Sequence, residues 1–341
     1  MKKIILKRTK PYVLLCYEAL FRWLLPQLRD NKVLQDEYAS YLAGYRGERN
    51  TDYIVSTYPH KDAYIFQGIR LKIGPFYFQI DTLIVTPRII LILESKNLKG
   101  ELEYNYKTRQ LVQLDGDQKK GYKNPILQAE THKRHLTAWL QQAGFPPIPI
   151  ATLGVSTNPS SILTYKDEHT SPINFIQLES LPNLFDNIYQ TNSKTVYDQT
   201  TIRKLNKTLL KDNTPLKPDL IKQYTINERH LIKGIGCTNC NHAPLQYKNR
   251  KWFCIKCGHQ YAKAHEQKIL DYFLLFEPSI TNRMCREILQ INSPKIARRL
   301  LYSMNLDYSG KNFGRKYHKP SLDMFPQESF LPIGKRSIFN D

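Results

Sequence analysis

The chain has 341 residues, which favours about two or three domains and is enough to bury a substantial core. Apolar residues make up 41% and charged residues 23% of the sequence, values that exclude collagen-like and wholly disordered chains. A formal net charge of +20 favours a polyanionic partner, either nucleic acid or an acidic membrane surface; the alternative is a basic protein without such a partner.

Charged residues interrupt the apolar stretches near the N-terminus. Lys7, Arg8 and Lys10 precede the first long apolar run, and Glu18 and Arg22 lie within it. The sequence therefore predicts neither an export signal nor a membrane span. We expect a cytoplasmic protein, in which closely spaced cysteines bind metal more often than they form disulfides.

Helical spacing of apolar residues predicts two N-terminal helices. The first lies within residues 12–28, where a proline stops it. The second covers roughly 32–45 and is expected to end at Gly44 or Gly47, because glycine is favoured just after a helix C-terminus. Glu48 would then follow directly after the helix.

Beyond these helices the period of the apolar residues changes to that of a strand. Three runs rich in aromatic and β-branched residues predict strands at 64–71, 76–85 and 89–96, the last two joined as a hairpin. Asn124-Pro125 predicts the start of a helix that continues to Ala143, and residues 148–156 predict a short buried strand. The order for residues 32–156 is αβββαβ, a mixed α/β core.

Charged residues lie at one end of the predicted hairpin. With its turn centred between residues 87 and 88, the numbers of cross-strand partners sum to 175, which places Asp81 opposite Glu94. Side chains alternate along a strand, so Lys96 shares the face of these acids. Two facing carboxylates require a cation or a shared proton, and Mg²⁺ prefers oxygen ligands. The alternative is an ion pair of Lys96 with one acid at an exposed sheet end.

Four motifs follow one another in this core: Ala43-Gly-Tyr-Arg-Gly-Glu48, Tyr77-Phe-Gln-Ile-Asp81, Ile92-Leu-Glu94-Ser-Lys96 and Asn124-Pro-Ile-Leu-Gln128. Together they resemble the NERD (nuclease-related) domain, which is regarded as a branch of the PD-(D/E)XK nuclease superfamily. The resemblance covers residues 32–156 and implies a restriction-endonuclease-like αβββαβ core. It also implies phosphodiester hydrolysis with Mg²⁺ or Mn²⁺, because a metal supplies a hydroxide-like nucleophile and stabilises charge on the phosphoryl oxygens.

The resemblance implies a role for each of five side chains, the candidate catalytic residues. Asp81 and Glu94 would hold the metal, and Lys96 would orient or activate the attacking water. Glu48 would assist from the end of its helix. Gln128 would position the substrate or the lysine.

Structural interpretations of the same region stay open. Glu48 could be a solvated acid after a helix end, and Gln128 a surface residue of an amphipathic helix. His132 and His135 are interpreted as packing or surface histidines rather than ligands. Ser95 stands where this family more often has a small apolar residue, but its side chain points to the opposite face of the strand from the acids.

Two cysteine pairs mark a second module. Cys237-Thr-Asn-Cys240 and Cys254-Ile-Lys-Cys257 are separated by 13 residues, a spacing that can place four thiolates tetrahedrally around Zn²⁺. The arrangement resembles a zinc ribbon, and a four-thiolate site leaves no open position for water, so the zinc is expected to be structural. A redox dithiol and unmetallated packing cysteines are the alternatives.

Basic and aromatic residues of the ribbon suit phosphate contact and base stacking, namely Lys248, Arg250, Lys251 and Trp252. The alternative is a solvated charged loop over a small aromatic core. Residues 265–304 predict three helices, and the short link 290–292 between the last two resembles a helix-turn-helix. Its exposed basic residues would be Lys295, Arg298 and Arg299. A basic three-helix packing unit is the other interpretation.

The sequence thus predicts five segments: an N-terminal helical segment (1–31), a NERD-like nuclease domain (32–156), an extension and linker (157–230), a zinc ribbon (231–262) and a helix-turn-helix-like module with a basic tail (263–341). We predict a metal-dependent nuclease whose partner is nucleic acid, with DNA favoured over RNA. We expect no membrane partner. The alternatives are a catalytically inactive DNA-binding or adaptor protein built on a nuclease fold, an RNA substrate, and a basic peripheral membrane protein.

Overall fold

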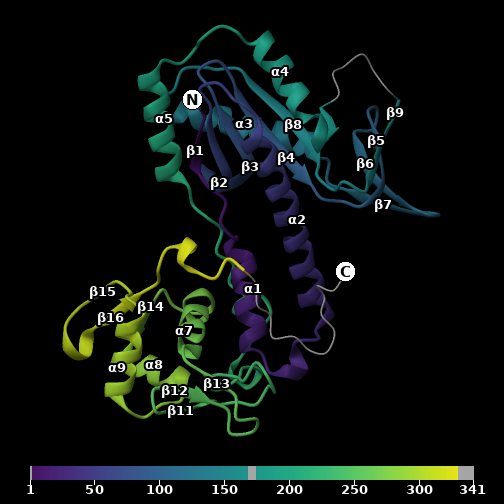
Figure 1. Ribbon diagram of the computed structural model, residues 1–341. Helices are drawn as coiled ribbons and strands as arrows, with labels where there is room; N and C mark the ends of the chain where they lie inside the picture. Colours follow the sequence, from purple (N-terminus) through teal and green to yellow (C-terminus); the bar gives the residue numbers. More distant parts are fainter. Residues whose placement is uncertain (1, 168–173, 329–341) are drawn as a thin grey trace. The chain divides into compact units, whose positions relative to one another are not determined.

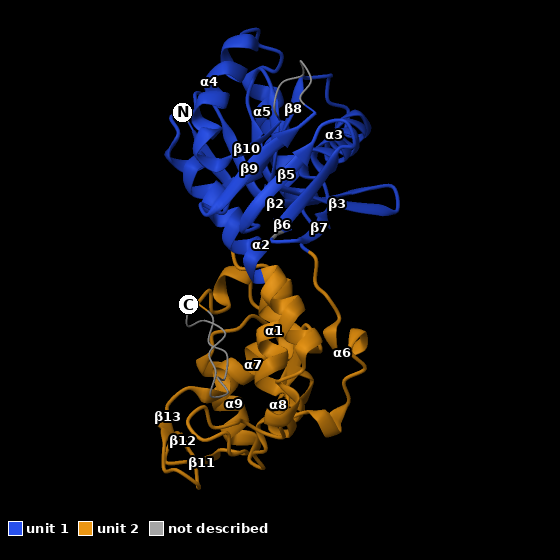
Figure 2. Ribbon diagram, turned by 90° about the vertical axis from the view of Figure 1, so that its right-hand side faces the viewer, with its two compact units in different colours: residues 1–8, 42–215 blue, residues 9–41, 216–341 orange. Residues whose placement is uncertain are grey.

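The computed structural model describes residues 2–167 and 174–328. The chain forms two compact units, each made of two separate stretches of sequence (Figure 2). Unit 1 combines Met1–Arg8 with Leu42–Pro215, and unit 2 combines Thr9–Tyr41 with Leu216–Asp341. The first predicted helix therefore belongs to the same unit as the C-terminal part of the chain.

Unit 1 contains a six-stranded sheet with the order β1-β2-β3-β4-β8-β10 (Figure 1). Its strands are β1 (Lys3–Leu6), β2 (Tyr64–Ile73), β3 (Phe76–Val85), β4 (Ile90–Lys96), β8 (Ile150–Ser156) and β10 (Phe175–Gln177). β2, β3 and β4 are antiparallel, whereas β1 is parallel to β2, and β8 is parallel to both β4 and β10. The numbers of the paired residues Val85 and Ile90 sum to 175, which confirms the predicted turn of the β3–β4 hairpin.

Helices cover both faces of this sheet. α3 (Pro125–Gln142) and α5 (Gln199–Asp212) pack on one face in a core that includes Ile80, Ile92, Trp139 and Leu205. α2 (Lys32–Thr57), which begins in unit 2 and continues into unit 1, and α4 (Leu181–Thr191) share a second core that includes Val55, Ile84, Leu93 and Phe185. Neighbouring strand residues point to opposite faces, so a sheet buried on both faces divides its apolar side chains between two cores.

The helix α2 is longer than predicted. Neither Gly44 nor Gly47 ends it, so the predicted end is wrong and Glu48 lies inside the helix. Packing supplies the reason, because a Cβ atom on Gly47 would lie 2.7 Å from Cβ of Asn97 and would collide with Oγ1 of Thr157. Gly47 therefore serves the close approach of α2 to the segments that follow β4 and β8.

A four-stranded sheet with the order β7-β6-β5-β9 also belongs to unit 1 and is not among the elements expected from the sequence. Its strands are β5 (Gly100–Asn105), β6 (Gln110–Asp115), β7 (Gln118–Tyr122) and β9 (Ser161–Lys166). Leu102, Tyr104 and Leu111 of this sheet pack against Ile126 of α3 and Phe175 of β10. The first three strands lie between β4 and α3 in the chain, and the Gln and Lys residues of β6 and β7 hide the apolar alternation typical of a strand.

Unit 2 joins an N-terminal helix to the C-terminal modules. Its helices are α1 (Tyr12–Trp23), the first part of α2, α6 (Leu220–Gln223), α7 (Ala264–Leu275), α8 (Asn282–Leu289) and α9 (Pro294–Ser303). Two three-stranded sheets complete it, one of β11 (Gln246–Lys248), β12 (Lys251–Phe253) and β13 (Gln260–Tyr261), the other of β14 (Ser279–Thr281), β16 (Lys316–His318) and β15 (Tyr308–Ser309). Arg22 of α1 donates through Nε and an Nη atom to Asp271 of α7, at 2.8 and 2.7 Å.

The three helices predicted in residues 265–304 are confirmed as α7, α8 and α9. Oγ of Ser293 accepts a hydrogen bond from the backbone N–H of Ile296, as expected for a residue that caps the start of α9. Over the described ranges, none of the helices combines the length and the hydropathy needed to cross a membrane.

Candidate active site and cysteine cluster

The candidate catalytic residues of unit 1 come from two strands and two helices. Asp81 lies on β3, and Glu94 and Lys96 lie on β4. Backbone pairing of the two strands stops at Thr82 and Leu93, one residue before the acids. Beyond this point the backbone N–H of Ser95 donates to a side chain of β3, the Oδ2 atom of Asp81, at 2.9 Å. The Asp81 carboxylate is thereby fixed against β4.

Glu94 is fully buried on the face of the sheet that α3 covers. Its Oε2 accepts a hydrogen bond from Nε2 of Gln128 at 2.7 Å, and its Oε1 lies 2.6 Å from Nδ1 of His132. Nζ of Lys96 donates to Oε1 of the same Gln128 at 3.0 Å. One amide of α3 thus links the acid and the lysine of β4. Burial, with the neighbouring Asp81 carboxylate, raises the pKa of Glu94 well above its ordinary value.

His132 lies closer to the candidate catalytic residues than the sequence indicated. Its side chain is 12% exposed and its ring lies 6.1 Å from that of Phe78, so it packs as predicted, but it also contacts the most buried acid of the site, Glu94. Gln128 and His132 are four residues apart on α3, so both face the end of β4. His135 also packs, with its ring 5.3 Å from that of Phe78. The i, i+4 spacing of glutamine and histidine was a usable signal in the sequence.

Ser95 points away from the acids, as predicted. Its Oγ lies 2.8 Å from Oγ1 of Thr51 on α2, and α2 covers the opposite face of the sheet from α3. The serine therefore contributes its backbone N–H to Asp81 and its hydroxyl to the packing of α2 on β4.

Glu48 reaches the site from the middle of α2. Its carboxylate contacts the guanidinium of Arg8, which also donates to Asp52. Burial, followed in importance by the nearby Asp81 carboxylate, raises the pKa of Glu48 to about 8. Sequence reasoning did not identify Arg8 or Asp52, because Arg8 lies far from the four motifs along the chain and Asp52 was assigned to no element.

When all its acids are ionised, this cluster needs a further positive charge for balance. Four carboxylates, those of Glu48, Asp52, Asp81 and Glu94, are matched by the two cations Arg8 and Lys96. Full ionisation would leave two negative charges uncompensated, and burial, followed by the nearby Asp81 carboxylate, raises the pKa values of both Glu48 and Glu94. A divalent cation with oxygen ligands would balance the two charges, so the residues present fit such an ion.

The comparison with known families agrees with this geometry. Residues 43–157 match the family model of the nuclease-related domain, NERD. This match confirms the resemblance recognised from the four motifs, and it includes Glu48, Asp81, Glu94, Lys96 and Gln128. No curated protein and no solved structure matches the chain significantly.

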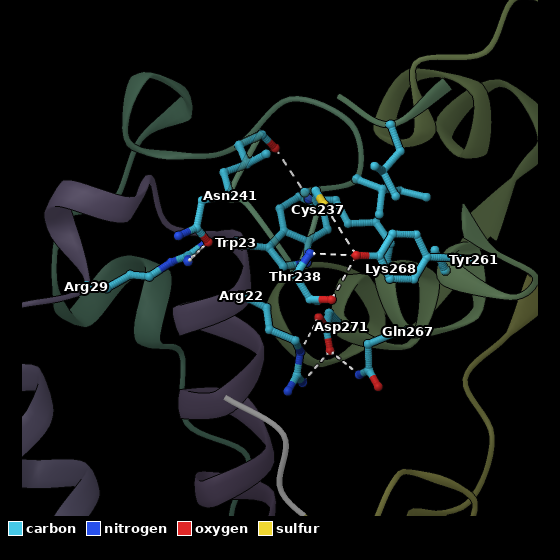
Figure 3. A pocket seen from close by; sticks show the side chains of 15 residues that line it. Arg22, Trp23, Arg29, Cys237, Thr238, Asn241, Tyr261, Gln267, Lys268 and Asp271 are labelled. Carbon is cyan, nitrogen blue, oxygen red and sulfur yellow. Dashed lines mark hydrogen bonds and ion pairs between the residues drawn. The ribbon is translucent and has the colours of Figure 1, made fainter. Parts of the chain in front are cut away.

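Outside the NERD domain, the four cysteines of the CxxC pairs come together in unit 2. Their Sγ atoms all lie within 4.8 Å of one another, so the cluster could hold a zinc ion. Each pair lies in a tight turn, where the backbone N–H of Asn241 donates to the carbonyl of Cys237 and that of Gly258 donates to the carbonyl of Cys254. The hydroxyl of Tyr261 lies 3.3 Å from Sγ of Cys237 (Figure 3). This set of four thiols suits zinc.

The basic residues predicted to contact nucleic acid are exposed. Those of the ribbon are Lys248, Arg250 and Lys251, and those of α9 are Lys295, Arg298 and Arg299. An Nη atom of Arg299 donates to the hydroxyl of Tyr247 on β11 at 3.3 Å, so α9 and the β11–β12 hairpin are neighbours. The prediction for Trp252 is wrong, because its side chain is fully buried and Nε1 donates to Nδ1 of His265 at 3.3 Å. Trp252 is the core of the ribbon and cannot stack on a base.

A cavity of about 150 Å³ lies beside the cysteine cluster, lined by the end of α1, the ribbon and α7 (Figure 3). Lys268 of α7 borders it and is only 6% exposed. Its Nζ lies 3.4 Å from the centroid of the Trp23 ring and donates to the carbonyl of Ile232 at 3.3 Å. Burial lowers the pKa of Lys268 to about 7.

Proposed function

We propose that the protein is a metal-dependent nuclease that hydrolyses phosphodiester bonds in DNA. One observation carries the proposal: within a segment that matches the nuclease-related domain, Glu94, Gln128 and Lys96 form a hydrogen-bonded row beside Asp81. Neighbouring acids can hold a metal ion, and a lysine beside them can offset charge on the phosphoryl oxygens, which suits phosphodiester hydrolysis.

The order of the elements around this site supports the assignment to the PD-(D/E)XK nucleases. We infer an αβββαβ core formed by α2, β2, β3, β4, α3 and β8, into which β5, β6 and β7 are inserted between β4 and α3. In this interpretation the insertion lies next to the last catalytic strand, because β5 begins at Gly100 and β4 ends at Lys96.

The side chains have distinct tasks in the proposed reaction. Asp81 and Glu94 would hold Mg²⁺ or Mn²⁺, which when bound polarises a phosphoryl oxygen and lowers the pKa of a bound water. Lys96, held by Gln128, would orient the attacking water and offset phosphate charge. His132, on the opposite oxygen of Glu94 from Gln128, would keep the Glu94 carboxylate in place. Glu48 would assist from α2, where Arg8 holds its carboxyl group.

The modules of unit 2 would hold the nucleic acid. Supporting this role, α9 and the β11–β12 hairpin are neighbours and both present exposed lysines and arginines, which suit a row of phosphates. The chain between β15 and β16 adds Lys311 and a fully exposed Phe313, and β16 begins with the exposed Lys316. A structural zinc ion at the four cysteines would hold the hairpin in place.

Cleavage of plasmid and linear DNA with Mg²⁺ or Mn²⁺ tests the proposal, with RNA of the same sequence assayed in parallel. Lys96→Met and Asp81→Asn should abolish cleavage, whereas Lys99→Met, an exposed lysine three residues further along, should cleave like the wild type. Circular dichroism would show that all three variants are folded. If the wild type cleaves neither substrate, yet every protein binds DNA with the same steep salt dependence, the non-catalytic adaptor is the correct alternative.

A further inference from the structure

Arg8 lies outside the NERD match, yet its side chain reaches the candidate active site. It follows β1, and its side chain is only 5% exposed. Nε and one Nη atom donate to the two carboxylate oxygens of Asp52, at 2.6 and 3.2 Å. The Nη atom that donates to Asp52 also donates to the backbone carbonyl of Asp81 at 2.6 Å. The other Nη atom contacts the Glu48 carboxylate. One guanidinium therefore joins α2 to β3 at the residue that carries a candidate metal ligand.

Two residues of β2 hold Arg8 in this place. Oε1 of the buried Gln67 accepts a hydrogen bond from the backbone N–H of Arg8 at 2.9 Å. Gly68 has a φ of +76°, and a Cβ atom on it would lie 3.0 Å from an Nη atom of Arg8. Glycine is needed here both for the backbone conformation and for the space that the guanidinium fills. The position is therefore shaped around an arginine.

The charge of Arg8 is matched to its surroundings. Burial would lower the pKa of this arginine, but the carboxylates of Glu48 and Asp52 raise it above the ordinary value. Without the guanidinium these two acids would face Asp81 with no fixed cation among them, and repulsion would favour their protonation or rotation. Lysine could not replace it fully, because a compact ammonium lacks the forked donors with which the guanidinium reaches Asp52, Glu48 and the Asp81 carbonyl at once.

We propose that Arg8 is a positioning residue of the nuclease site, which holds Glu48 and the backbone of Asp81 so that the Asp81 carboxylate faces the metal. This inference rests on the proposed nuclease function. Arg8 itself does not touch the reacting atoms, because its guanidinium contacts are with protein oxygens. The segment matched to the nuclease-related domain would then be incomplete without residues that precede it.

The test compares full-length wild type with Arg8→Ala and Arg8→Lys. Arg70→Ala is the control, because this arginine belongs to the same unit but contacts the carbonyl of Thr214 and the ring of Tyr77. The readouts are Mn²⁺ affinity by calorimetry and kcat for DNA cleavage. We expect Arg8→Ala to lower both by about 10- to 100-fold, as is typical when residues that orient metal ligands are removed. Arg8→Lys should lie between Arg8→Ala and the wild type.

Chemical rescue separates positioning from a general loss of structure. The alanine variant leaves space for a free guanidinium ion, so guanidinium chloride far below denaturing concentrations should restore part of the cleavage, and sodium chloride at the same ionic strength should not. If Arg8→Ala does not fold, Gly68→Ala provides the same test, because it keeps every charge and displaces the guanidinium. Gly74→Ala is its control, with a positive φ of +53° but open space around the Cβ position.

Three results would overturn the proposal. Folded Arg8→Ala could bind Mn²⁺ and cleave DNA like the wild type, which would leave the nuclease function intact and exclude a role for Arg8. Cleavage by Arg8→Ala could be lost without rescue while Gly68→Ala stays active, which would show that Arg8 is only structural. If the wild type itself neither binds Mn²⁺ nor cleaves DNA, the nuclease function fails, and the role of Arg8 fails with it.

Discussion

The close contact between α2 and the sheet makes a quantitative prediction at Gly47. In an exposed helix interior, replacing glycine by alanine stabilises a protein by about 0.5–1 kcal/mol. At Gly47 the new Cβ atom would lie 2.7 Å from Cβ of Asn97, about 1 Å closer than carbon atoms in ordinary contact. Such overpacking costs about 1–3 kcal/mol. The substitution should therefore destabilise unit 1 in spite of the better helix propensity of alanine.

Gly44 is a matched control in the same helix, because a Cβ atom there would have nothing within 4 Å. The gain in helix propensity is common to both substitutions, so the free energies of unfolding of Gly44→Ala and Gly47→Ala should differ by the cost of overpacking, about 1–3 kcal/mol. Urea unfolding followed by circular dichroism measures this difference. Hydrogen exchange in peptides from β4 and β8 assigns the change to unit 1. Equal stability of the two variants would refute the packing argument.

Gly47→Ala should also reduce the rate of DNA cleavage. The backbone N–H of Thr157 donates to the carbonyl of Lys96 at 2.9 Å, and Nδ2 of Asn97 donates to the carbonyl of Ala43 at 2.7 Å. A shift of Thr157 or Asn97 away from Gly47 is therefore transmitted to the strand that carries Lys96. A folded Gly47→Ala protein with wild-type kcat would show that the site tolerates this displacement.

Two further predictions concern unit 2. Cys254→Ser should reduce the zinc content, measured by atomic absorption, from one equivalent to near zero. Cys285→Ser is the control and should keep its zinc, because Cys285 is a buried cysteine outside the cluster. Zinc retained by Cys254→Ser would contradict a four-thiolate site. Between pH 7 and 10.5, Lys268 is protonated in the unfolded chain but neutral in the folded protein. The burial of Lys268 therefore costs less as the pH rises, and the free energy of unfolding should increase by up to about 1.4 kcal/mol per pH unit. Urea titrations across this range should lose that slope in Lys268→Met, and an unchanged slope would exclude a depressed pKa.

Local sequence patterns predicted the parts of unit 1 that depend on neighbours along the chain. The β3–β4 hairpin has strong strand propensity and a short turn, so its register followed from residue alternation alone. The start of α3 was predicted from the pair Asn124-Pro125, and Asn124 does accept hydrogen bonds from the backbone N–H groups of Ile126 and Leu127. The hairpin register was enough to place Asp81, Glu94 and Lys96 together at one end of the two strands.

Features that depend on tertiary contacts could not be predicted in this way. Gly47 resembles a helix end in sequence, and only the approach of Asn97 and Thr157 explains a glycine within a helix. Arg8 reaches the site through the parallel pairing of β1 with β2, a contact between segments about 60 residues apart. Trp252 was assigned to stacking because basic residues surround it, but the small ribbon needs a large apolar side chain for its own core.

The discontinuous units have a practical consequence for dissecting the protein. The chain passes between them after Arg8, after Tyr41 and after Pro215, so neither unit can be expressed as one uninterrupted fragment. A fragment cut at the limits of the family match, 43–157, would lack β1 and β10. It would leave β2 and β8 as unpaired edges, which invite aggregation. Joining residue 8 directly to residue 42 and ending at 215 would keep the six-stranded sheet complete.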